Sequence, residues 1–229
     1  PADAPTVSID PVLQRILAAG LAAPSADNDH RFRVSVKSAR RIRVLGPDNA
    51  PKLATQARLL FLLSFGAVLE NLRLSALAQG LCSRVTWVGN PAADRPIVDV
   101  SLEDTSEAKD PLVDAIPVRH TNRTLMFRGP GLTPSGKKAI EAAAQHVPRC
   151  ALSWLDETPL RSVAARLART AETERFRVQN LHEELFSCVR FDLGWSATCT
   201  QGLPPGALGV EVPLRVPFRL LGRWGVMRT

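Results

Sequence analysis

Hydrophobic periodicity predicts two helices and four strands in the N-terminal half of the chain. Apolar residues recur at three- and four-residue spacing from Asp10 to Ala22, which predicts an amphipathic helix whose N-cap is Asp10. A second helix is expected from about Leu53 to Gln79; it is apolar nearly all round its middle and should therefore be central to the fold. Alternating apolar and polar residues predict strands at Phe32–Val36, Arg41–Leu45, Arg84–Val88 and Ile97–Leu102.

The C-terminal half is expected to contain helices, one strand and an irregular tail. Thr133 and Pro134 form a cap and first-turn pair at the start of the first helix. The expected elements are helices at Thr133–Gln145, Pro159–Thr170 and Glu172–Val189, and a strand at Ala151–Leu155. From Gly202 onward the chain is rich in Pro and Gly without clear periodicity, so we expect it to wrap over other elements.

A charged, turn-rich segment, residues 103–111, marks the boundary between two halves of the chain. We therefore expect a first half at residues 1–105 and a second half at residues 106–229. The order helix, strand, helix recurs loosely in both halves, which indicates an internal duplication. Because the sequence starts at Pro1 without a Met and stops at Thr229, we expect a processed or excised piece with an incomplete second half.

Composition excludes several protein classes. With 45% hydrophobic and 22% charged residues, the chain is globular, and disordered, collagen-like and coiled-coil classes do not fit. The longest apolar run, Leu59–Leu69, is shorter than the roughly 20 residues that span a bilayer, so we expect a buried core helix and no membrane partner. Four scattered cysteines without a CxxC pair indicate a reducing cytoplasm and no metal site.

The net charge of +7 does not by itself name a partner. The arginines are spread along the chain, as expected for solvated surface residues. The chain has no Tyr, and Phe32 alone is a poor platform for stacking bases. We therefore expect no nucleic-acid partner, although the N-terminal strands carry a basic group of residues, Arg31, Arg33, Arg40, Arg41 and Arg43.

The first stretch that could carry chemistry is Ala23–Phe32, a small turn-forming loop between a helix and a strand. Such a loop leaves backbone N–H groups and short polar side chains free to meet a flat polar ligand. Ser25 and Asn28 are the candidate binding residues. The alternative is a plain helix-ending turn in which the Ser, Asp and Asn side chains bond to their own backbone.

The second stretch is Arg119-His120-Thr121-Asn122-Arg123. Two guanidinium groups around a hydroxyl make a suitable phosphate clamp, because Arg binds phosphate through paired charge-assisted hydrogen bonds and Thr adds a neutral donor. The alternative is an exposed basic loop in which the charges are merely solvated.

Together the two stretches resemble motifs of the FMN-dependent nitroreductase family. The first is similar to the family's A-P-S-S-x-N-x-Q-P-W flavin loop, which it matches at Ala23, Pro24, Ser25 and Asn28 and from which it departs at Ala26, His30, Arg31 and Phe32. The second is similar to the family's R-x-S-x-R phosphate element, with Thr121 in the Ser position. Residues 67–81 are similar to the family's long central helix.

The order of these motifs differs from that of ordinary family members, in which the R-x-S-x-R element comes first. Here the arginine stretch lies in the second half, downstream of Ser25 and Asn28. This order is similar to that of the dormancy-associated, Acg-type branch, whose members look like fused nitroreductase pairs. The resemblance implies an α+β nitroreductase-like fold with two pseudo-equivalent halves, a mixed or antiparallel sheet and one flavin site formed by both halves.

The resemblance also implies a function, that of a bacterial-like flavoprotein oxidoreductase in the cytoplasm. FMN would take a hydride from NAD(P)H and pass it to a small nitro, quinone or similar acceptor. Ser25 and Asn28 would meet the flavin ring or ribityl chain, while Arg119, Thr121 and Arg123, with His120 beside them, would hold the phosphate. No catalytic acid or base is implied. Either a homodimer or a further domain of the same polypeptide is expected.

The altered loop and the early end of the chain favour an alternative. In this second hypothesis the chain binds or sequesters FMN without turnover, or is a degenerate domain of a larger fused protein.

Overall fold

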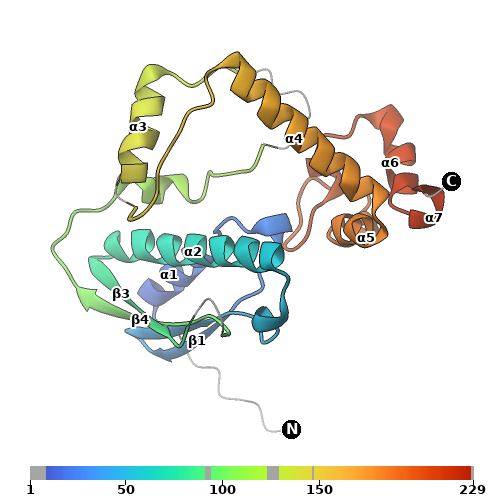
Figure 1. Ribbon diagram of the computed structural model, residues 1–229. Helices are drawn as coiled ribbons and strands as arrows, with labels where there is room; N and C mark the ends of the chain where they lie inside the picture. Colours follow the sequence, from blue (N-terminus) through green and yellow to red (C-terminus); the bar gives the residue numbers. More distant parts are fainter. Residues whose placement is uncertain (1–8, 91–93, 123–128, 146, 228–229) are drawn as a thin grey trace, which may run out of the picture. The chain divides into compact units, whose positions relative to one another are not determined.

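The computed structural model describes residues 9–90, 94–122, 129–145 and 147–227, and Figure 1 labels its elements. The chain forms two compact units. Unit 1 contains the chain up to residue 122 together with residues 200–202, and unit 2 contains residues 123–199 and 203–229. Residues 200–202 thus return from near the C-terminal end of the sequence to unit 1, where they contact the first candidate loop.

Unit 1 is built on a four-stranded antiparallel sheet with the strand order β1-β2-β4-β3. Helices α1 and α2 lie on the same face of this sheet (Figure 1). The elements are α1 (Pro11–Leu21), η1 (Ala26–Asn28), β1 (Arg33–Ser38), β2 (Arg41–Leu45), η2 (Ala50–Lys52), α2 (Thr55–Leu77), β3 (Leu81–Val88), β4 (Ile97–Asp104) and η3 (Pro111–Ala115), where η marks a short 3-10 helix. The helices and strands predicted for the N-terminal half are confirmed to within a few residues, and so is the α+β class.

The sheet separates apolar from polar residues because successive side chains of a strand point to opposite faces. Val34, Val44 and Val98 lie in register across β1, β2 and β4 and belong to the core that packs under the helices. In the neighbouring row Arg43 and Asp99 lie opposite each other and form two hydrogen bonds of 2.6 and 2.7 Å. The alternation therefore fixes which face of the sheet the helices cover.

Helix α2 supplies the largest part of this core. Phe61, Phe65, Val68 and Leu72 recur at four- and three-residue spacing and form a buried stripe along the helix. Gly20 of α1 lies directly against this stripe, where a Cβ atom at Gly20 would come within 2.8 Å of Leu72 Cδ2. The absence of a side chain at this position therefore lets the two helices cross closely.

Among the described residues, α2 alone is long and apolar enough to cross a membrane, judged by length and composition only. The sequence prediction counted only the apolar run Leu59–Leu69 and so underestimated the apolar length of this helix. In unit 1 the buried stripe of α2 packs against α1 and the sheet.

Unit 2 is mainly helical in the part that the structure describes. Its elements are α3 (Pro134–Gln145), α4 (Thr158–Arg177), α5 (Gln179–Ser187), η4 (Phe191–Leu193), η5 (Pro205–Leu208), η6 (Val212–Leu214), α6 (Arg215–Leu221) and α7 (Trp224–Met227). The helix predicted at Thr133–Gln145 is confirmed, and the Thr133 hydroxyl accepts a hydrogen bond from the Gly136 N–H, 3.1 Å away, as an N-cap should. The irregular tail expected after Gly202 instead contains short helices, including α6 and α7.

The strand predicted at Ala151–Leu155 is wrong, because these residues belong to no strand. Side chains hold the segment against α3 in place of a strand partner. The Trp154 indole N–H donates to the Glu141 carboxylate at 2.6 Å, and the Lys137 ammonium lies 5.0 Å from the centre of the Trp154 ring.

The predicted break between two helices at residue 171 is also wrong. Helix α4 continues through this position to Arg177, and an ion pair of 3.2 Å between Glu172 and Arg175 lies within it. The chain leaves the helix only at Val178, whose φ of −104° and ψ of 118° are extended. Residue 171 is neither Gly nor Pro, the residues that most often end a helix. The periodicity therefore predicted a break inside what is one continuous helix.

The described part of unit 2 has no sheet, apart from an isolated bridge between Val189 and Leu203. That the two halves of the chain share one fold stays a prediction.

Candidate functional site

The first candidate loop follows α1 and turns sharply at η1. Asp27 and Asn28 have positive φ angles of 53° and 54°, a conformation that Asp and Asn tolerate better than most residues with a side chain. These two residues reverse the chain and place Ser25 and His30 on either side of the turn.

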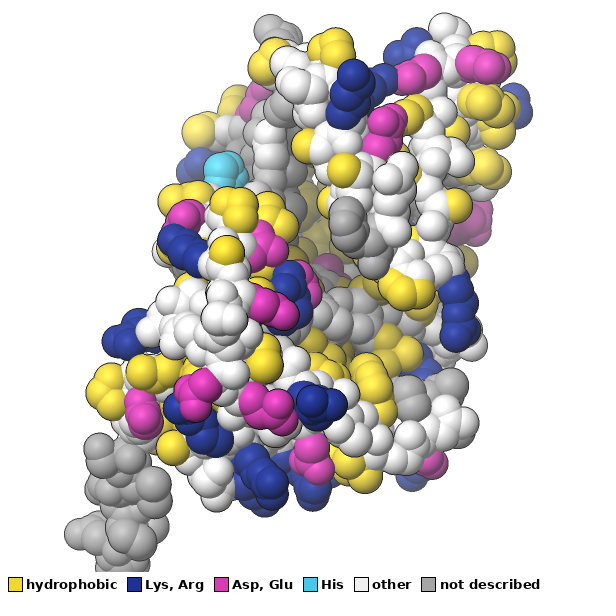
Figure 2. Space-filling view, turned by 90° about the vertical axis from the view of Figure 1, so that its left-hand side faces the viewer, with side chains coloured by type: hydrophobic (Ala, Val, Ile, Leu, Met, Phe, Trp, Pro, Cys, Tyr) yellow, Lys and Arg dark blue, Asp and Glu magenta, His cyan; other side chains and the backbone are white. Residues whose placement is uncertain are grey.

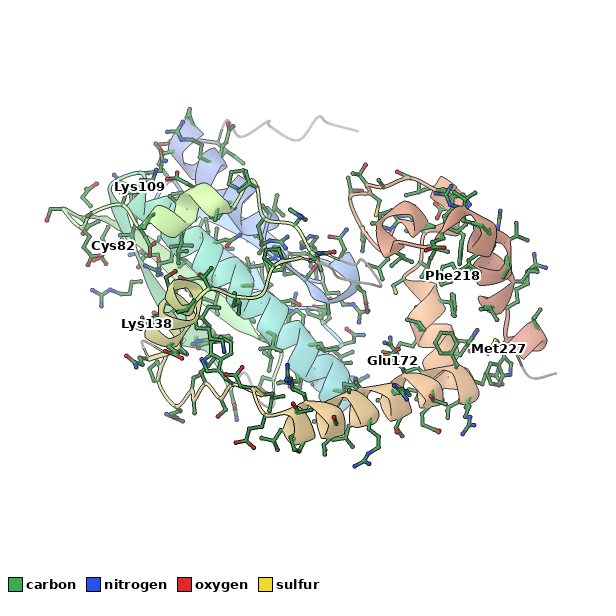
Figure 3. All side chains as sticks on the ribbon, turned by 90° about the horizontal axis from the view of Figure 1, so that it is seen from above. Cys82, Lys109, Lys138, Glu172, Phe218 and Met227 are labelled. Atoms are coloured by element: carbon green, nitrogen blue, oxygen red, sulfur yellow. The ribbon has the colours of Figure 1, made fainter. Side chains whose placement is uncertain are left out.

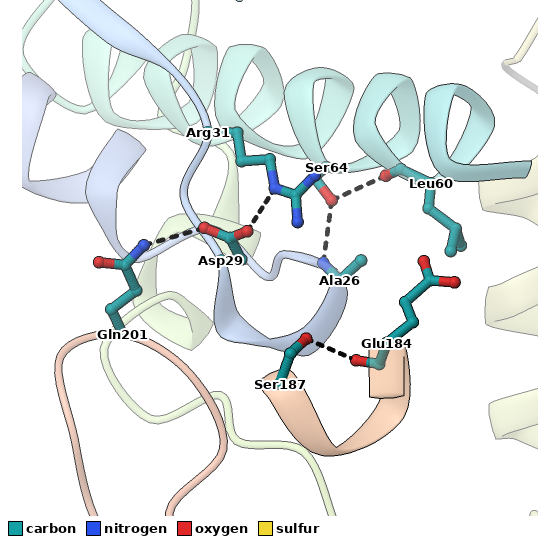
Figure 4. A network of polar contacts seen from close by, with 8 residues as sticks. All are labelled: Ala26, Asp29, Arg31, Leu60, Ser64, Glu184, Ser187 and Gln201. Carbon is teal, nitrogen blue, oxygen red and sulfur yellow. Dashed lines mark hydrogen bonds and ion pairs between the residues drawn. The ribbon is translucent and has the colours of Figure 1, made fainter. Parts of the chain in front are cut away.

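Ser64 of α2 anchors this loop (Figure 4). The backbone N–H of Ala26 donates to the Ser64 hydroxyl oxygen at 3.0 Å, and the same hydroxyl donates to the Leu60 carbonyl at 2.8 Å. Ser64, which interrupts the apolar run Leu59–Leu69, was not identified from the sequence. A hydroxyl inside such a run was the available signal, because a polar side chain in a mostly apolar segment usually has a hydrogen-bond partner.

The returning segment 200–202 holds the other side of the loop. The Asn28 side-chain amide donates to the Gly202 carbonyl at 3.1 Å, and the Gly202 N–H donates to the Asn28 carbonyl at 3.0 Å. Gln201 adds a hydrogen bond of 2.9 Å from its side-chain amide to the Asp29 carboxylate (Figure 4). Sequence reasoning missed Gln201 and Gly202, because nothing in the local pattern links them to a loop so far upstream.

Two side-chain atoms of the loop are buried without a hydrogen-bond partner among the described residues. They are the Ser25 hydroxyl oxygen and His30 Nδ1. The His30 ring meets Phe32 edge-on, with 5.7 Å between the ring centres. A buried polar atom without a partner costs free energy on the order of 1–3 kcal/mol, so a ligand that supplied the missing hydrogen bond would be stabilised at this loop.

The second candidate stretch follows η3 as an exposed loop. The Arg119 backbone N–H donates to the Ala115 carbonyl at 2.9 Å, and its guanidinium donates to the Thr121 hydroxyl at 3.5 Å. His120 Nδ1 lies 3.3 Å from the Val118 carbonyl, to which it donates in the tautomer that carries its hydrogen there. Arg119, His120 and Thr121 are thus solvent-exposed and close to one another, whereas Arg123 lies outside the described residues.

Helix α2 also anchors the beginning of η3. The Arg73 guanidinium pairs with Glu70 at 2.7 Å and with Asp110 at 3.4 Å. The hydrogen bonds from Arg73 to Glu70 raise the pKa of Arg73, so Arg73 stays positively charged. Ser64 and Arg73 are nine residues apart, about 13 Å along the helix axis. The structure therefore brings Ser25 and Asn28 together in one loop and Arg119 and Thr121 in another, each with its own anchor on α2.

The remaining polar groups do not form a metal centre in the described part of the chain, where no cluster of three or more His, Cys, Asp or Glu could hold an ion. On the face that Figure 2 shows, Lys and Arg side chains are interspersed with Asp and Glu rather than gathered in one field. This distribution agrees with the expectation that most arginines are solvated surface residues.

Comparison with known proteins gives matches to solved structures alone. No protein-family model matches the chain, and no curated protein matches it. Nitroreductase A from Vibrio parahaemolyticus is 18% identical with a TM-score of 0.34, and the alignment covers 60% of this chain and 76% of that protein. The NADPH:FMN oxidoreductase from Vibrio harveyi, solved with NAD+, is 16% identical with a TM-score of 0.35, over 70% of this chain and 83% of that protein. These scores are too low for function to be transferred from either protein.

Proposed function

We propose that this chain is an FMN-binding, nitroreductase-like oxidoreductase that acts in the cytoplasm on a small nitro, quinone or similar acceptor, with NAD(P)H as the electron donor. The observation that carries the proposal is the buried Ser25 hydroxyl, which has no hydrogen-bond partner among the described residues and lies in the loop that resembles the flavin loop of the nitroreductase family. When bound, FMN supplies the hydride chemistry, and the protein holds and orients it.

The residues present fit such a cofactor. The Ser25 hydroxyl can donate to or accept from a flavin heteroatom, which would satisfy its missing hydrogen bond. Arg119 and Thr121 are exposed and lie within 3.5 Å of each other, so both can reach one phosphate group. Arg123 is proposed as the second cation of this clamp, with His120 beside it.

Asn28 has a different part in the proposal. Its side-chain amide is bonded to the Gly202 carbonyl, so it positions the loop that carries Ser25. No residue is proposed as a catalytic acid or base. Assembly as a homodimer, or with a further domain of the same polypeptide, and membership of the Acg-type branch belong to the same proposal.

The second candidate is an FMN-binding protein without turnover. It is favoured by the residues that replace the Gln-Pro-Trp end of the family loop, because Arg31 forms an ion pair with Asp29 and so closes this part of the loop on itself. Addition of NAD(P)H to the FMN-loaded protein separates the two candidates. Bleaching of the flavin absorbance, followed by recovery with a quinone or nitro compound, indicates the enzyme; an unbleached spectrum indicates storage.

Binding is tested by titration of FMN and riboflavin, which lacks the phosphate, into the flavin-free chain while flavin fluorescence is followed. Loss of one hydrogen bond in Ser25→Ala should weaken both ligands about tenfold. The double variant Arg119→Ala, Arg123→Ala should weaken FMN only and abolish its preference over riboflavin. Arg166→Ala, an exposed arginine on α4, is the matched control and should change neither ligand. A chain that binds neither flavin, or affinities that are unchanged in all variants, would refute the proposal.

A further inference from the structure

Unit 2 contains an apolar cavity of about 510 Å³. It lies where the C-terminal end of α4 meets α5, α6 and the segment that carries η5 and η6, and all of its lining residues belong to unit 2. Figure 3 labels Glu172 on α4 and Phe218 on α6, two of the residues that line it. The volume lies in the range of about 300–1,000 Å³ that is typical of small-molecule sites.

The lining of the cavity is almost entirely carbon. Among the described residues that line it, Glu172 alone has a charged or polar side chain, and its carboxylate accepts a hydrogen bond of 3.2 Å from Arg175. Three phenylalanines form an aromatic wall, with ring centres 6.2 Å apart for Phe176 and Phe186 and 5.6 Å apart for Phe186 and Phe218. An aromatic ligand can stack on or meet the edges of such rings, whereas a charged ligand would lose its hydration without a free partner.

Hydrogen bonds outside the cavity hold its walls in place. His182 is fully buried behind Phe186, with ring centres 4.7 Å apart, and its Nε2–H donates to the Leu221 carbonyl at 2.7 Å. On another wall, the Leu203 N–H donates to the Cys188 carbonyl at 2.7 Å, and the Leu203 carbonyl accepts from the Arg190 N–H at 2.9 Å. The backbone groups at these walls therefore already have hydrogen-bond partners. A ligand in the cavity would be held by apolar contacts.

We propose that this cavity binds an uncharged, apolar molecule that contains an aromatic ring. Burial of such a ligand removes apolar surface of both the ligand and the lining residues from water, and it adds van der Waals contacts to the phenylalanine rings. Because lining residues such as Leu214 and Leu221 are 52% and 37% exposed, the cavity is open to solvent, and a ligand would displace water from its apolar surface. The proposal concerns unit 2 alone and does not depend on FMN binding.

The test uses two fluorescent probes with one skeleton, N-phenyl-1-naphthylamine, which is uncharged, and 8-anilino-1-naphthalenesulfonate, which adds a sulfonate. Titration into the full chain should give saturable binding of one uncharged probe, and at least tenfold weaker binding of the sulfonate. Leu208→Trp adds an indole to the lining and should weaken the uncharged probe at least tenfold. Leu167→Trp, an equally large substitution on an exposed part of α4 outside the cavity, should leave binding unchanged.

Glu172→Gln completes the design, because its carboxylate is already bonded to Arg175 and an uncharged ligand should not use it. Unchanged affinity in this variant supports the proposal. Equal binding of both probes, equal loss in Leu208→Trp and Leu167→Trp, or probe binding that is lost as the chain self-associates would overturn it. The FMN titration is run on the same variants; failure of flavin binding with intact probe binding would reject the proposed function and leave the cavity site standing.

Discussion

Replacement of Gly20 by Ala should destabilise unit 1, although alanine is the better helix former. Gly20 is buried in the last turns of α1 and faces α2. A methyl group at this position would lie 2.8 Å from Leu72 Cδ2 and 3.1 Å from Leu72 Cγ. Carbon atoms in good contact are about 3.5–4.0 Å apart, so either Leu72 or the helix must move.

The size of the effect follows from two opposing terms. Overpacking of a buried site costs about 1–3 kcal/mol, and Leu72 is only 2% exposed, which leaves it little room to adjust. The change from Gly to Ala in a helix stabilises the helix by up to about 1 kcal/mol, and by less near a helix end. We therefore expect a net loss of up to about 3 kcal/mol in the free energy of unfolding of unit 1, and in any case a less stable protein than the helix propensity of alanine alone would give.

Gly66→Ala is the matched control, because Gly66 lies in the middle of α2 and a Cβ atom there would meet no atom of the described residues within 4 Å. This variant should gain up to about 1 kcal/mol from helix propensity alone. Urea unfolding followed by hydrogen exchange of α1 and α2 peptides measures both changes within unit 1. If Gly20→Ala were as stabilising as Gly66→Ala, the close crossing of α1 and α2 would be refuted.

Three further changes test individual contacts. Ser64→Ala removes the acceptor for the Ala26 N–H and should speed hydrogen exchange of η1 about fivefold, while exchange in η3 stays unchanged. Trp154→Phe removes the indole donor to Glu141, and faster exchange of residues 150–156 is expected; unaltered exchange would show that this bond does not fix the segment. Asp99→Asn should lower the melting temperature of unit 1 at pH 7, because hydrogen bonds from Arg43 hold the pKa of Asp99 below its ordinary value. That stabilisation is present above the ordinary Asp pKa and is lost as the pH falls through the lowered one, so the difference between Asp99→Asn and wild type should shrink below about pH 4.

Local patterns predicted the elements of unit 1 because each carries its own signal. The Asp10 carboxylate accepts a hydrogen bond from the Val12 N–H at 2.6 Å, and Gly80, after α2, has a φ of 72°, as cap residues at the two ends should. The strands of the sheet have one buried and one solvated face, so the alternation of apolar and polar residues was readable.

The wrong predictions in unit 2 share one physical cause: contacts between residues far apart in the sequence decided the structure there. Residues 151–155 have the composition of a strand, but the partner that holds them is a helix, through the Trp154 side chain. The end of α4 depends on where Val178 must turn the chain into α5, and no residue type near 171 or 178 announces it. The α6 helix lies in a segment whose many Pro and Gly residues indicated irregular structure.

The candidate loop shows how far sequence can go toward a site. Ser25 and Asn28 were singled out together, as though they had one role. The structure separates them, because the Asn28 amide is bonded to Gly202, a residue 174 positions away, whereas the buried Ser25 hydroxyl has no partner in the part of the chain that the structure describes. The first arrangement stabilises a loop by itself, and the second gains stability only when something else supplies a hydrogen bond. Since a motif match cannot distinguish a positioning residue from a ligand-binding residue, the unsatisfied hydroxyl of Ser25 is the stronger reason to expect a bound molecule at this loop.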